Sequence, residues 1–227
     1  MNPRGRPRGS GTPPDLRAIL ADNRVVPVIV SDDPGIAGPL SRALLAGGIG
    51  IAEVTLRTPN ALRVLAGMAG TPGLVAGAGT VLNARQAQDA VSCGARFLVS
   101  PGYSPSVNQA AADAGVPVLP GVATATEMMR AIDDGHAVVK YFPAAASGGP
   151  AALRALSAPF GMLEFVPTGG ITQASAATWL ELPAVIAVGG SWMATPDLLR
   201  SRDFTAITAL ALAATRLPRH ETESARA

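Results

Sequence analysis

The stretch LVAGAGTVLNARQAQDAVSCGARFLVSPGYSPSVNQAAADA, residues 74–114, repeats one pattern twice. Each repeat begins with a short apolar run, at 74–78 and at 96–99, and continues into an Ala-rich amphipathic segment, at 84–92 and at 104–114. Short continuous apolar runs are typical of strands that are buried on both faces. Their alternation with helices indicates βα units in a parallel sheet.

The same alternation extends outward over most of the chain. Apolar runs occur at 25–30, 50–56, 74–78, 96–99, 116–119, 137–142, 163–166 and 184–188. Further amphipathic segments lie at 34–46, 124–134 and 173–180. Eight units in series predict an α/β protein with a single (β/α)8 barrel of the TIM type, rather than an open sheet. We expect an N-terminal helix at Asp15–Ala21 to close the barrel floor and a last outer helix at Phe204–Arg216.

The barrel is predicted to be the single domain of the chain, over residues 15–217, because α/β barrels commonly reach this length. Hydrophobic residues make up 48% of the chain and aromatic residues only 4%, which predicts a core of Ala, Val, Leu and Ile. The segments outside it are a basic Pro/Gly-rich one at 1–14 and a polar one at 218–227. We expect the first to be a disordered tail and the second to be a frayed polar tail.

Charge and composition exclude several classes of partner. The net charge is +2, and Arg4, Arg6 and Arg8 all lie in the first tail, so no basic surface for nucleic acid is expected. We expect no signal peptide, and no apolar run is long enough to span a bilayer, so no membrane partner is predicted. Cys93 is the only cysteine, which excludes an internal disulfide and favours the cytoplasm.

Lys140 is the only lysine among eighteen basic residues, and it lies in the apolar run AVVKYFP at 137–143. Apolar surroundings disfavour the charged form of an amine, which then becomes a nucleophile able to form a Schiff base with a ketone. The alternative is a strand residue whose ammonium group reaches the surface. The run by itself leaves both interpretations open.

Glu53, Thr55 and Arg57 alternate along the second run, so a strand conformation points all three to the same side. A carboxylate on an apolar strand indicates a group that titrates in the chemistry. The alternative is an ion pair, Glu53–Lys140 or Glu53–Arg57, that serves only the fold.

Small residues follow four of the predicted strands. Gly77-Ala78-Gly79-Thr80 and Ser100-Pro101-Gly102 allow a ligand to approach the backbone, although glycine turns alone are weak signals. Pro167-Thr168-Gly169-Gly170 and Gly189-Gly190-Ser191 follow the seventh and eighth runs, where barrels frequently bind phosphate through backbone N–H groups. The Ser191 hydroxyl adds a donor, so we predict a phosphate-bearing ligand.

The histidines and the cysteine are too few and too widely separated to predict a zinc site. His136, His220 and Cys93 do not form a recognisable ligand spacing, so no metal ion is expected.

Several of these segments together resemble a known family. VVPVIV, GGIGIAEVTLRT, VAGAGTVLN, FLVSPG, VLPGVAT, VVKYFPA, FVPTGGI and AVGGSW are similar, in order, to the signatures of the 2-keto-3-deoxy-6-phosphogluconate (KDPG) aldolases, class I aldolases of the Entner–Doudoroff pathway. The resemblance extends from about Val25 to Trp192. It implies a lyase that cleaves this phosphorylated keto acid to pyruvate and glyceraldehyde 3-phosphate, and often 4-hydroxy-2-oxoglutarate to pyruvate and glyoxylate. It also implies a homotrimer that uses no metal or other cofactor.

The resemblance assigns roles to individual residues. It implies that Lys140 is the Schiff-base lysine and Glu53 the acid–base group, that Arg57 and Thr80 contact the substrate carboxylate, and that Pro101 lines the pyruvyl pocket. The residues implied for the alcohol and phosphate end are Thr168, Gly169, Gly170, Gly189, Gly190 and Ser191.

One departure and two alternatives stay open at this point. Family members commonly carry Glu where this chain has Ala145, which leaves loop electrostatics and substrate range unsettled. A related Schiff-base aldolase for the galacto epimer, or one acting mainly on 4-hydroxy-2-oxoglutarate, fits the same motifs. A non-catalytic barrel that binds a sugar phosphate is a third interpretation, against which the joint retention of Lys140, Glu53 and Arg57 argues.

Overall fold

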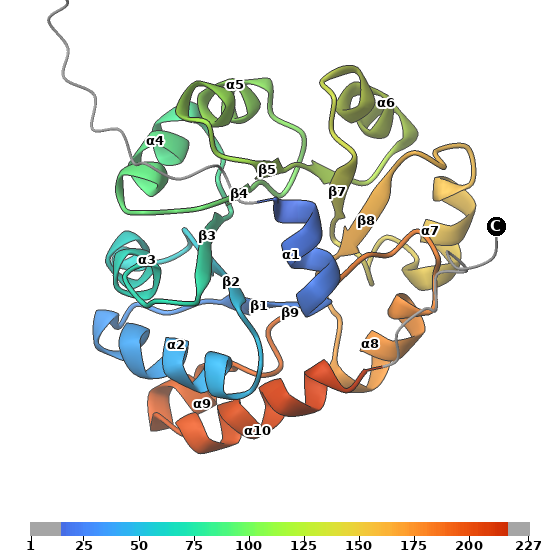
Figure 1. Ribbon diagram of the computed structural model, residues 1–227. Helices are drawn as coiled ribbons and strands as arrows, with labels where there is room; N and C mark the ends of the chain where they lie inside the picture. Colours follow the sequence, from blue (N-terminus) through green and yellow to red (C-terminus); the bar gives the residue numbers. More distant parts are fainter. Residues whose placement is uncertain (1–14, 218–227) are drawn as a thin grey trace, which may run out of the picture.

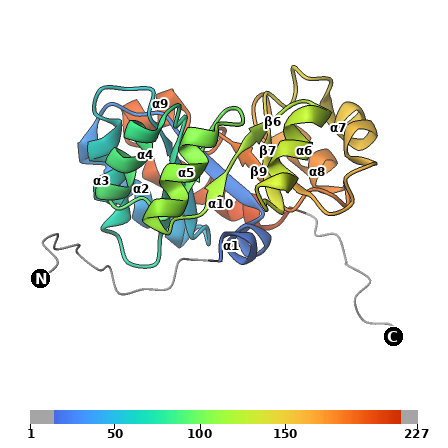
Figure 2. The ribbon, with the colours of Figure 1, turned by 90° about the horizontal axis from the view of Figure 1, so that it is seen from above.

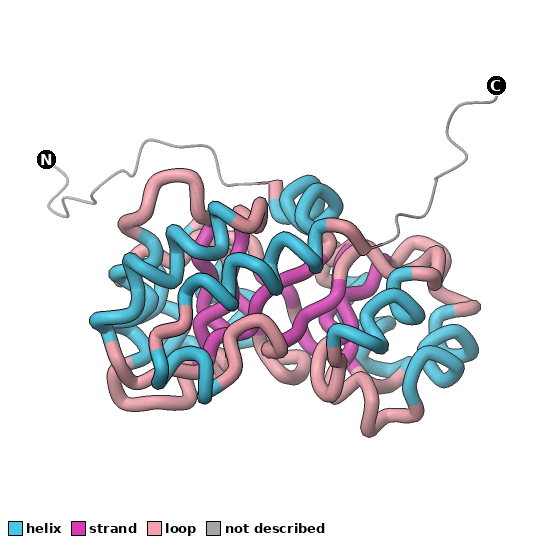
Figure 3. Tube along the Cα trace, turned by 90° about the horizontal axis from the view of Figure 1, so that it is seen from below, coloured by secondary structure: helices cyan, strands magenta, loops and turns pink. Residues whose placement is uncertain are grey.

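The structure, a computed structural model, describes residues 15–217, so both expected tails lie outside the described residues. Short parallel strands lie inside and helices lie outside (Figures 1 and 3). The strands are β1 Val25–Ile29, β2 Ile51–Thr55, β3 Val75–Gly79, β4 Leu98–Val99, β5 Val118–Leu119, β6 Gly121–Val122, β7 Val138–Tyr141, β8 Glu164–Pro167 and β9 Val188–Gly190. The helices are α1 Leu16–Asn23, α2 Ala37–Ala46, α3 Ala61–Ala69, α4 Ala84–Ser92, α5 Pro105–Ala114, α6 Ala125–Asp133, α7 Gly149–Ser157, α8 Gln173–Leu180, α9 Pro196–Ser201 and α10 Phe204–Thr215.

The strands form two sheets, one in the order β5-β4-β3-β2-β1-β9 and one in the order β6-β7-β8. Every pairing between named strands is parallel, as the alternation of strands and helices predicts. The strands curl around a common interior (Figure 1), and α1 lies across one end of them (Figure 2). The α/β class and the N-terminal helix are therefore confirmed.

Closure into a complete eight-stranded barrel is not confirmed. The expected fifth strand at 116–119 is shortened to β5, and β6 follows beyond it after Pro120, which has no N–H to donate to a ladder. Its carbonyl still accepts from Lys140 N at 2.9 Å. The expected eighth strand at 184–188 is also displaced, since β9 covers Val188–Gly190 and Val185 contributes only an isolated bridge to Phe165.

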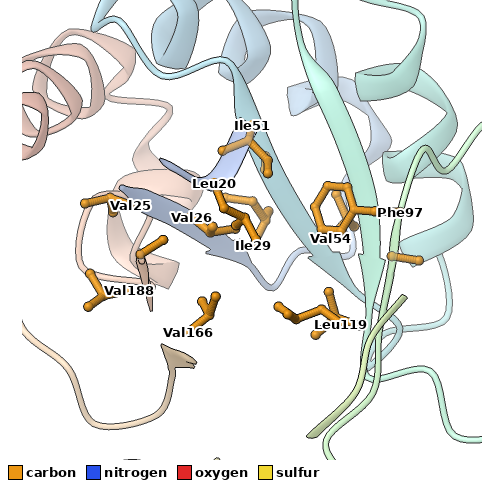
Figure 4. Close-up of a cluster of buried hydrophobic side chains, with 14 of the residues drawn as sticks. Leu20, Val25, Val26, Ile29, Ile51, Val54, Phe97, Leu119, Val166 and Val188 are labelled. Atoms are coloured by element: carbon orange, nitrogen blue, oxygen red, sulfur yellow. The ribbon is translucent and has the colours of Figure 1, made fainter. Parts of the chain in front are cut away.

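An aliphatic core holds the curled sheet together. Figure 4 shows side chains from β1, β2, β8 and β9, together with Leu20 of α1, gathered in one cluster. Ile29, Ile51 and Val54 are fully buried, and each such side chain contributes about 1.5–3 kcal/mol through removal from water. Phe97 packs directly on β3, where a Cβ at Gly77 would lie 2.4 Å from its ring. This core fixes the strands from which the polar side chains project.

Side-chain caps define where the outer helices begin after the loops. Asn83 accepts from Gln86 N at the start of α4, and Thr124 forms a capping box with Glu127 at the start of α6. Each such cap contributes about 1 kcal/mol. The expected helix at 34–46 begins as a 3-10 turn at Pro34–Ile36, before α2. Within residues 15–217, no helix is long and apolar enough to cross a membrane.

Candidate active site

The strand interior brings Glu53 and Lys140 together. Glu53 is the third residue of β2 and Lys140 the third residue of β7, so each sheet contributes one partner. Lys140 Nζ donates to Glu53 Oε1 at 3.1 Å and to Oε2 at 3.4 Å. The two side chains are 4% and 3% exposed. The interpretation of Lys140 as a residue that reaches the surface is therefore wrong, because the curled sheet encloses its whole length.

Removing two charges from water costs several kcal/mol per ion, so a buried ion pair needs attractive contacts that offset this desolvation. The two hydrogen bonds to Glu53 supply part of it. The ring of Phe142 adds a further contact, with its centroid 5.3 Å from Lys140 Nζ, where its negative face attracts a cation.

Gly79 gives the carboxylate its space. A Cβ at Gly79 would lie 2.0 Å from Glu53 Oε1, a distance that no side chain tolerates. The small residues at 77–80 were expected to admit a ligand, and at Gly79 the group that approaches the backbone is the Glu53 side chain. Thr55, which shares the parity of Glu53, is buried and donates through Oγ1 to Ile29 O at 3.0 Å.

Arg57 pairs with Thr80 and not with Glu53. Its Nε donates to Thr80 Oγ1 at 3.2 Å, and its side chain is exposed. Thr80 has φ +57°, a left-handed conformation that is costly for a β-branched residue. The structure therefore brings together Arg57 and Thr80, the two residues predicted to contact the substrate carboxylate, just beyond the ends of β2 and β3.

Pro101 lies beside β6, the strand that pairs with β7, and β7 carries Lys140. A Cβ at Gly121 would lie 2.3 Å from the Pro101 carbonyl carbon, and Gly121 is the register partner of Lys140. The Pro101 backbone is thus held against β6, one strand away from the amine.

The glycine segments adjoin each other at the ends of β8 and β9. Thr168 directly follows β8 and bridges to Gly189, where a Cβ would lie 2.3 Å from Thr168 Oγ1. Gly169 and Gly170 have φ +100° and +75°, which glycine adopts without strain. Ser191 is exposed.

The expectation that Gly189 and Gly190 form a loop after the last strand is wrong, because both belong to β9. Gly190 also has a packing reason to be glycine, since a Cβ there would lie 1.8 Å from the Trp192 ring. The sequence reasoning missed Trp192, although it directly follows Ser191. Its Nε1 is buried and has no hydrogen-bond partner within the described residues.

Ala145, the departure from the family pattern, lies against the glycine turn after β8. Ala145 N donates to Gly169 O at 3.0 Å, and a Cβ at Gly170 would lie 2.6 Å from the Ala145 Cβ. The chain reaches this position through a cis peptide bond between Phe142 and Pro143. A longer side chain at 145 would therefore alter the surroundings of the turn.

The residues with metal-binding side chains stay apart. No group of three or more His, Cys, Asp or Glu side chains within residues 15–217 is arranged to hold a metal ion. Burial lowers the pKa of His136, which lies near Tyr103 and Asp134, away from the Lys140–Glu53 pair. His220 lies outside the described residues.

Comparisons with known proteins identify the family of the chain. The family model for KDPG and KHG aldolase matches residues 16–210. The KHG/KDPG aldolase of Escherichia coli K12 is 42% identical over 195 residues, which cover 86% of this chain and 92% of that protein.

Two solved structures share both fold and sequence. The KDPG aldolase of Zymomonas mobilis ZM4, crystallised with 3-phosphoglycerate, has a TM-score of 0.84 and 41% identity, and covers 91% of this chain and 97% of its own. The KDPG aldolase of Legionella pneumophila, with pyruvate captured as a covalent carbinolamine, has the same TM-score and identity and covers 87% and 97%.

Proposed function

The chain belongs to the KDPG and KHG aldolase family, and from this premise we propose that it cleaves KDPG to pyruvate and glyceraldehyde 3-phosphate through a Schiff base on Lys140. It is an aldolase, a carbon–carbon lyase. The observation that carries the proposal is the buried contact between the only lysine of the chain and a carboxylate. The same contact argues against a barrel that only binds sugar phosphates, because such a protein gains nothing from an amine poised beside an acid.

The first step needs a neutral amine. Glu53, 3.1 Å from Lys140 Nζ, accepts one proton from the ammonium group, and the freed lone pair attacks C2 of the keto acid. Glu53 returns this proton to the hydroxyl group of the resulting carbinolamine, which leaves as water, so that a protonated imine and an ionised Glu53 remain. The covalent carbinolamine of pyruvate in the Legionella structure is an intermediate of this kind.

The second step breaks the C3–C4 bond. Glu53 accepts the proton of the C4 hydroxyl group, glyceraldehyde 3-phosphate leaves as the aldehyde, and the bonding electrons move through C3 to the imine nitrogen of Lys140. The cationic imine acts as the electron sink that a neutral ketone cannot supply. Glu53 then returns a proton to C3 of the enamine, and hydrolysis of the imine releases pyruvate. The steps balance without a metal ion or an organic cofactor.

Arg57 is proposed to hold the substrate carboxylate. Because Thr80 takes the Nε–H, the two terminal nitrogens are left to form a bidentate pair with a carboxylate. Thr80 completes this contact, and the Pro101 backbone is proposed to line the pyruvyl pocket on the side of β6.

The phosphate is proposed to lie at the adjoining segments that follow β8 and end β9. Backbone N–H groups at Gly169 and Gly170, in their left-handed conformation, and the exposed Ser191 hydroxyl suit an anion. Thr168 is proposed to contact the alcohol, with Gly189 giving room to the Thr168 side chain and Gly190 to the Trp192 ring. Ala145 places no carboxylate beside this turn, which favours a dianionic phosphate. Because the pyruvyl end is shared, 4-hydroxy-2-oxoglutarate is proposed as a second substrate.

Four further proposals concern assembly and setting. We propose a complete (β/α)8 barrel, in which β5 and β6 are one strand interrupted at Pro120 and the isolated bridges join β8 to the last strand. From the family resemblance we propose a homotrimer that serves the Entner–Doudoroff pathway. The lone Cys93 supports a reducing cytoplasm as its compartment.

Reduction of the imine tests the proposal. Incubation with pyruvate and borohydride, followed by peptide mass mapping, is expected to modify one side chain, Lys140, and to abolish cleavage of KDPG. Lys140→Arg is the matched control, since a guanidinium group keeps the charge and forms no imine. Cleavage by Lys140→Ala at the wild-type rate, or an unmodified Lys140 peptide, would contradict it.

A further inference from the structure

The turn that follows β4 lies very close to the strand beside Lys140. A Cβ at Gly121 would lie 2.3 Å from the Pro101 carbonyl carbon, 2.4 Å from the Pro101 oxygen and 2.5 Å from Gly102 N. Since these three distances are nearly equal, the peptide unit between Pro101 and Gly102 presents its flat face to Gly121. Only glycine at position 121 allows the two backbone segments to approach this closely.

This peptide unit lies on the side of β6 to which Lys140 points. Gly121 and Lys140 are register partners, and side chains at paired positions of neighbouring strands point to the same face of a sheet. The Lys140 side chain points into the interior, where it meets Glu53. The Pro101–Gly102 peptide therefore takes the interior space that a side chain at position 121 would fill, beside the Lys140 side chain.

The polar groups of this peptide unit are available to a ligand. No hydrogen bond within residues 15–217 uses the Pro101 carbonyl oxygen or the Gly102 N–H group. Both residues are partly exposed. Because backbone N–H and C=O groups are strong hydrogen-bonding groups, a free pair of them next to the amine can serve a bound keto acid.

The Ser100 hydroxyl group holds the turn in place. Ser100 is 1% exposed, and its Oγ donates to Gly102 O at 2.7 Å, across the Pro101–Gly102 peptide. The Ser100 N–H group donates to Leu119 O at 3.3 Å, which joins the start of the turn to β5. The hydroxyl group therefore restrains the orientation of the peptide whose face lies on Gly121.

We propose that Ser100 is a positioning residue of the aldolase reaction. Its hydroxyl group keeps the Pro101–Gly102 peptide flat against β6, and the free C=O and N–H groups of that peptide form a polar wall of the pyruvyl pocket beside Lys140. Ser100 acts through the backbone and not on the reacting atoms. The inference rests on the proposed function, because this wall contacts a keto acid only if Lys140 binds one.

Borohydride trapping of pyruvate on Lys140, measured over a range of pyruvate concentrations in the full-length protein, tests the proposal. Ser100→Ala is expected to raise the half-saturating pyruvate concentration by about threefold to tenfold, which corresponds to the loss of one hydrogen bond. The trapping rate at saturating pyruvate should stay within about twofold, because Lys140 and Glu53 keep their contact. Ser100→Cys retains a weak donor and should give an intermediate value.

Ser41→Ala is the matched control. Ser41 is also buried, and its Oγ donates to a backbone carbonyl, Ala37 O, at 2.8 Å, but it lies on α2, outside the sheet. Removal of this hydroxyl group should lower the thermal stability as Ser100→Ala does, and leave the half-saturating pyruvate concentration unchanged. If Ser100→Ala does not fold, Ser100→Cys and Ser41→Cys form the corresponding pair.

The outcomes separate this inference from the proposed function. An unchanged half-saturating concentration in the Ser100 variant, or an equal rise in the Ser41 variant, would overturn the positioning role while the wild type is still trapped at Lys140. Absence of trapping in the wild type would overturn the proposed function, and this inference with it.

Discussion

The two ends of the candidate active site are built in different ways. At the reactive end, Lys140 and Glu53 are side chains in the middle of strands, both nearly fully buried, and they come from different sheets. The far end is built differently: Gly169 and Gly170 lie in the bend after β8, and Ser191 directly follows β9. The groups proposed to bind phosphate there are mostly backbone N–H groups.

Each construction suits a different part of the proposed reaction. Proton and bond transfer need two groups held at a fixed separation, which packed strands provide. An anion needs several donors and tolerates solvent, which a turn provides. Damage at the reactive end is therefore expected to affect every substrate, and damage at the far end only substrates that carry phosphate.

Replacing Lys140 is the strongest test. Lys140→Ala is expected to lower kcat by about a millionfold, the scale for loss of a covalent nucleophile. Because the amine is proposed to react with the shared pyruvyl end, cleavage rates of KDPG and of 4-hydroxy-2-oxoglutarate should fall together. A loss confined to one substrate would show that the two ends are not divided as described.

Glu53→Gln is expected to lower kcat by about a hundredfold to ten-thousandfold on both substrates, the usual range for an acid–base group. Borohydride should still trap pyruvate on Lys140, at a slower rate, because the amide carries no charge that would prevent imine formation. Trapping and turnover are measured on one preparation. If both fall by the same factor, Glu53 acts on Lys140 at imine formation and is not the base that cleaves the C3–C4 bond.

At the far end, Ser191→Asp is expected to raise KM for KDPG by about tenfold or more, because a carboxylate would face the phosphate. KM for 4-hydroxy-2-oxoglutarate should stay within about twofold. Ser191→Ala is the matched control, with a smaller effect on KDPG. Gly190→Val is a poorer test, since it disturbs Trp192 as well. Equal changes for both substrates in Ser191→Asp would remove the phosphate from this position.

Thr80→Val keeps the shape of the side chain and removes the acceptor for Arg57 Nε. We expect KM for both substrates to rise about twofold to tenfold, which corresponds to the loss of one hydrogen bond. The effect on kcat is expected to be smaller. Thr80→Ser retains the hydroxyl group and should stay near the wild type. Equal KM values for Thr80→Val and Thr80→Ser would contradict a positioning role.

The smallest effect is expected away from both ends, at His136. Its pKa in the folded state is lowered by burial, so below about pH 6.5 the unfolded chain binds a proton that the folded chain resists. Stability is therefore lost as the pH falls through this window. His136→Gln removes this titrating group, so the free energy of unfolding, measured with urea at pH 7.5 and pH 5, should depend less on pH than in the wild type. An unchanged pH dependence would contradict this assignment.

Sequence patterns located most elements. The helices expected at 84–92 and 173–180 have those bounds in the structure, because each is short and begins after a side-chain cap, Asn83 or Thr172. The displaced β9 was missed because its last two residues, Gly189 and Gly190, carry no side chain that records a strand period.

The sequence alone determined the parts that depend on residue chemistry and local period. A lone lysine in an apolar run, a carboxylate on a strand and glycines in pairs are visible without coordinates, and the family resemblance of their segments implied the reaction class. Only the tertiary structure decided that Lys140 meets Glu53, 87 residues away, that Gly79 makes room for that carboxylate, and that Thr80 and not Glu53 holds Arg57. A pattern along one strand sets which way a side chain points, whereas the distance between side chains of different sheets depends on how the whole sheet curls.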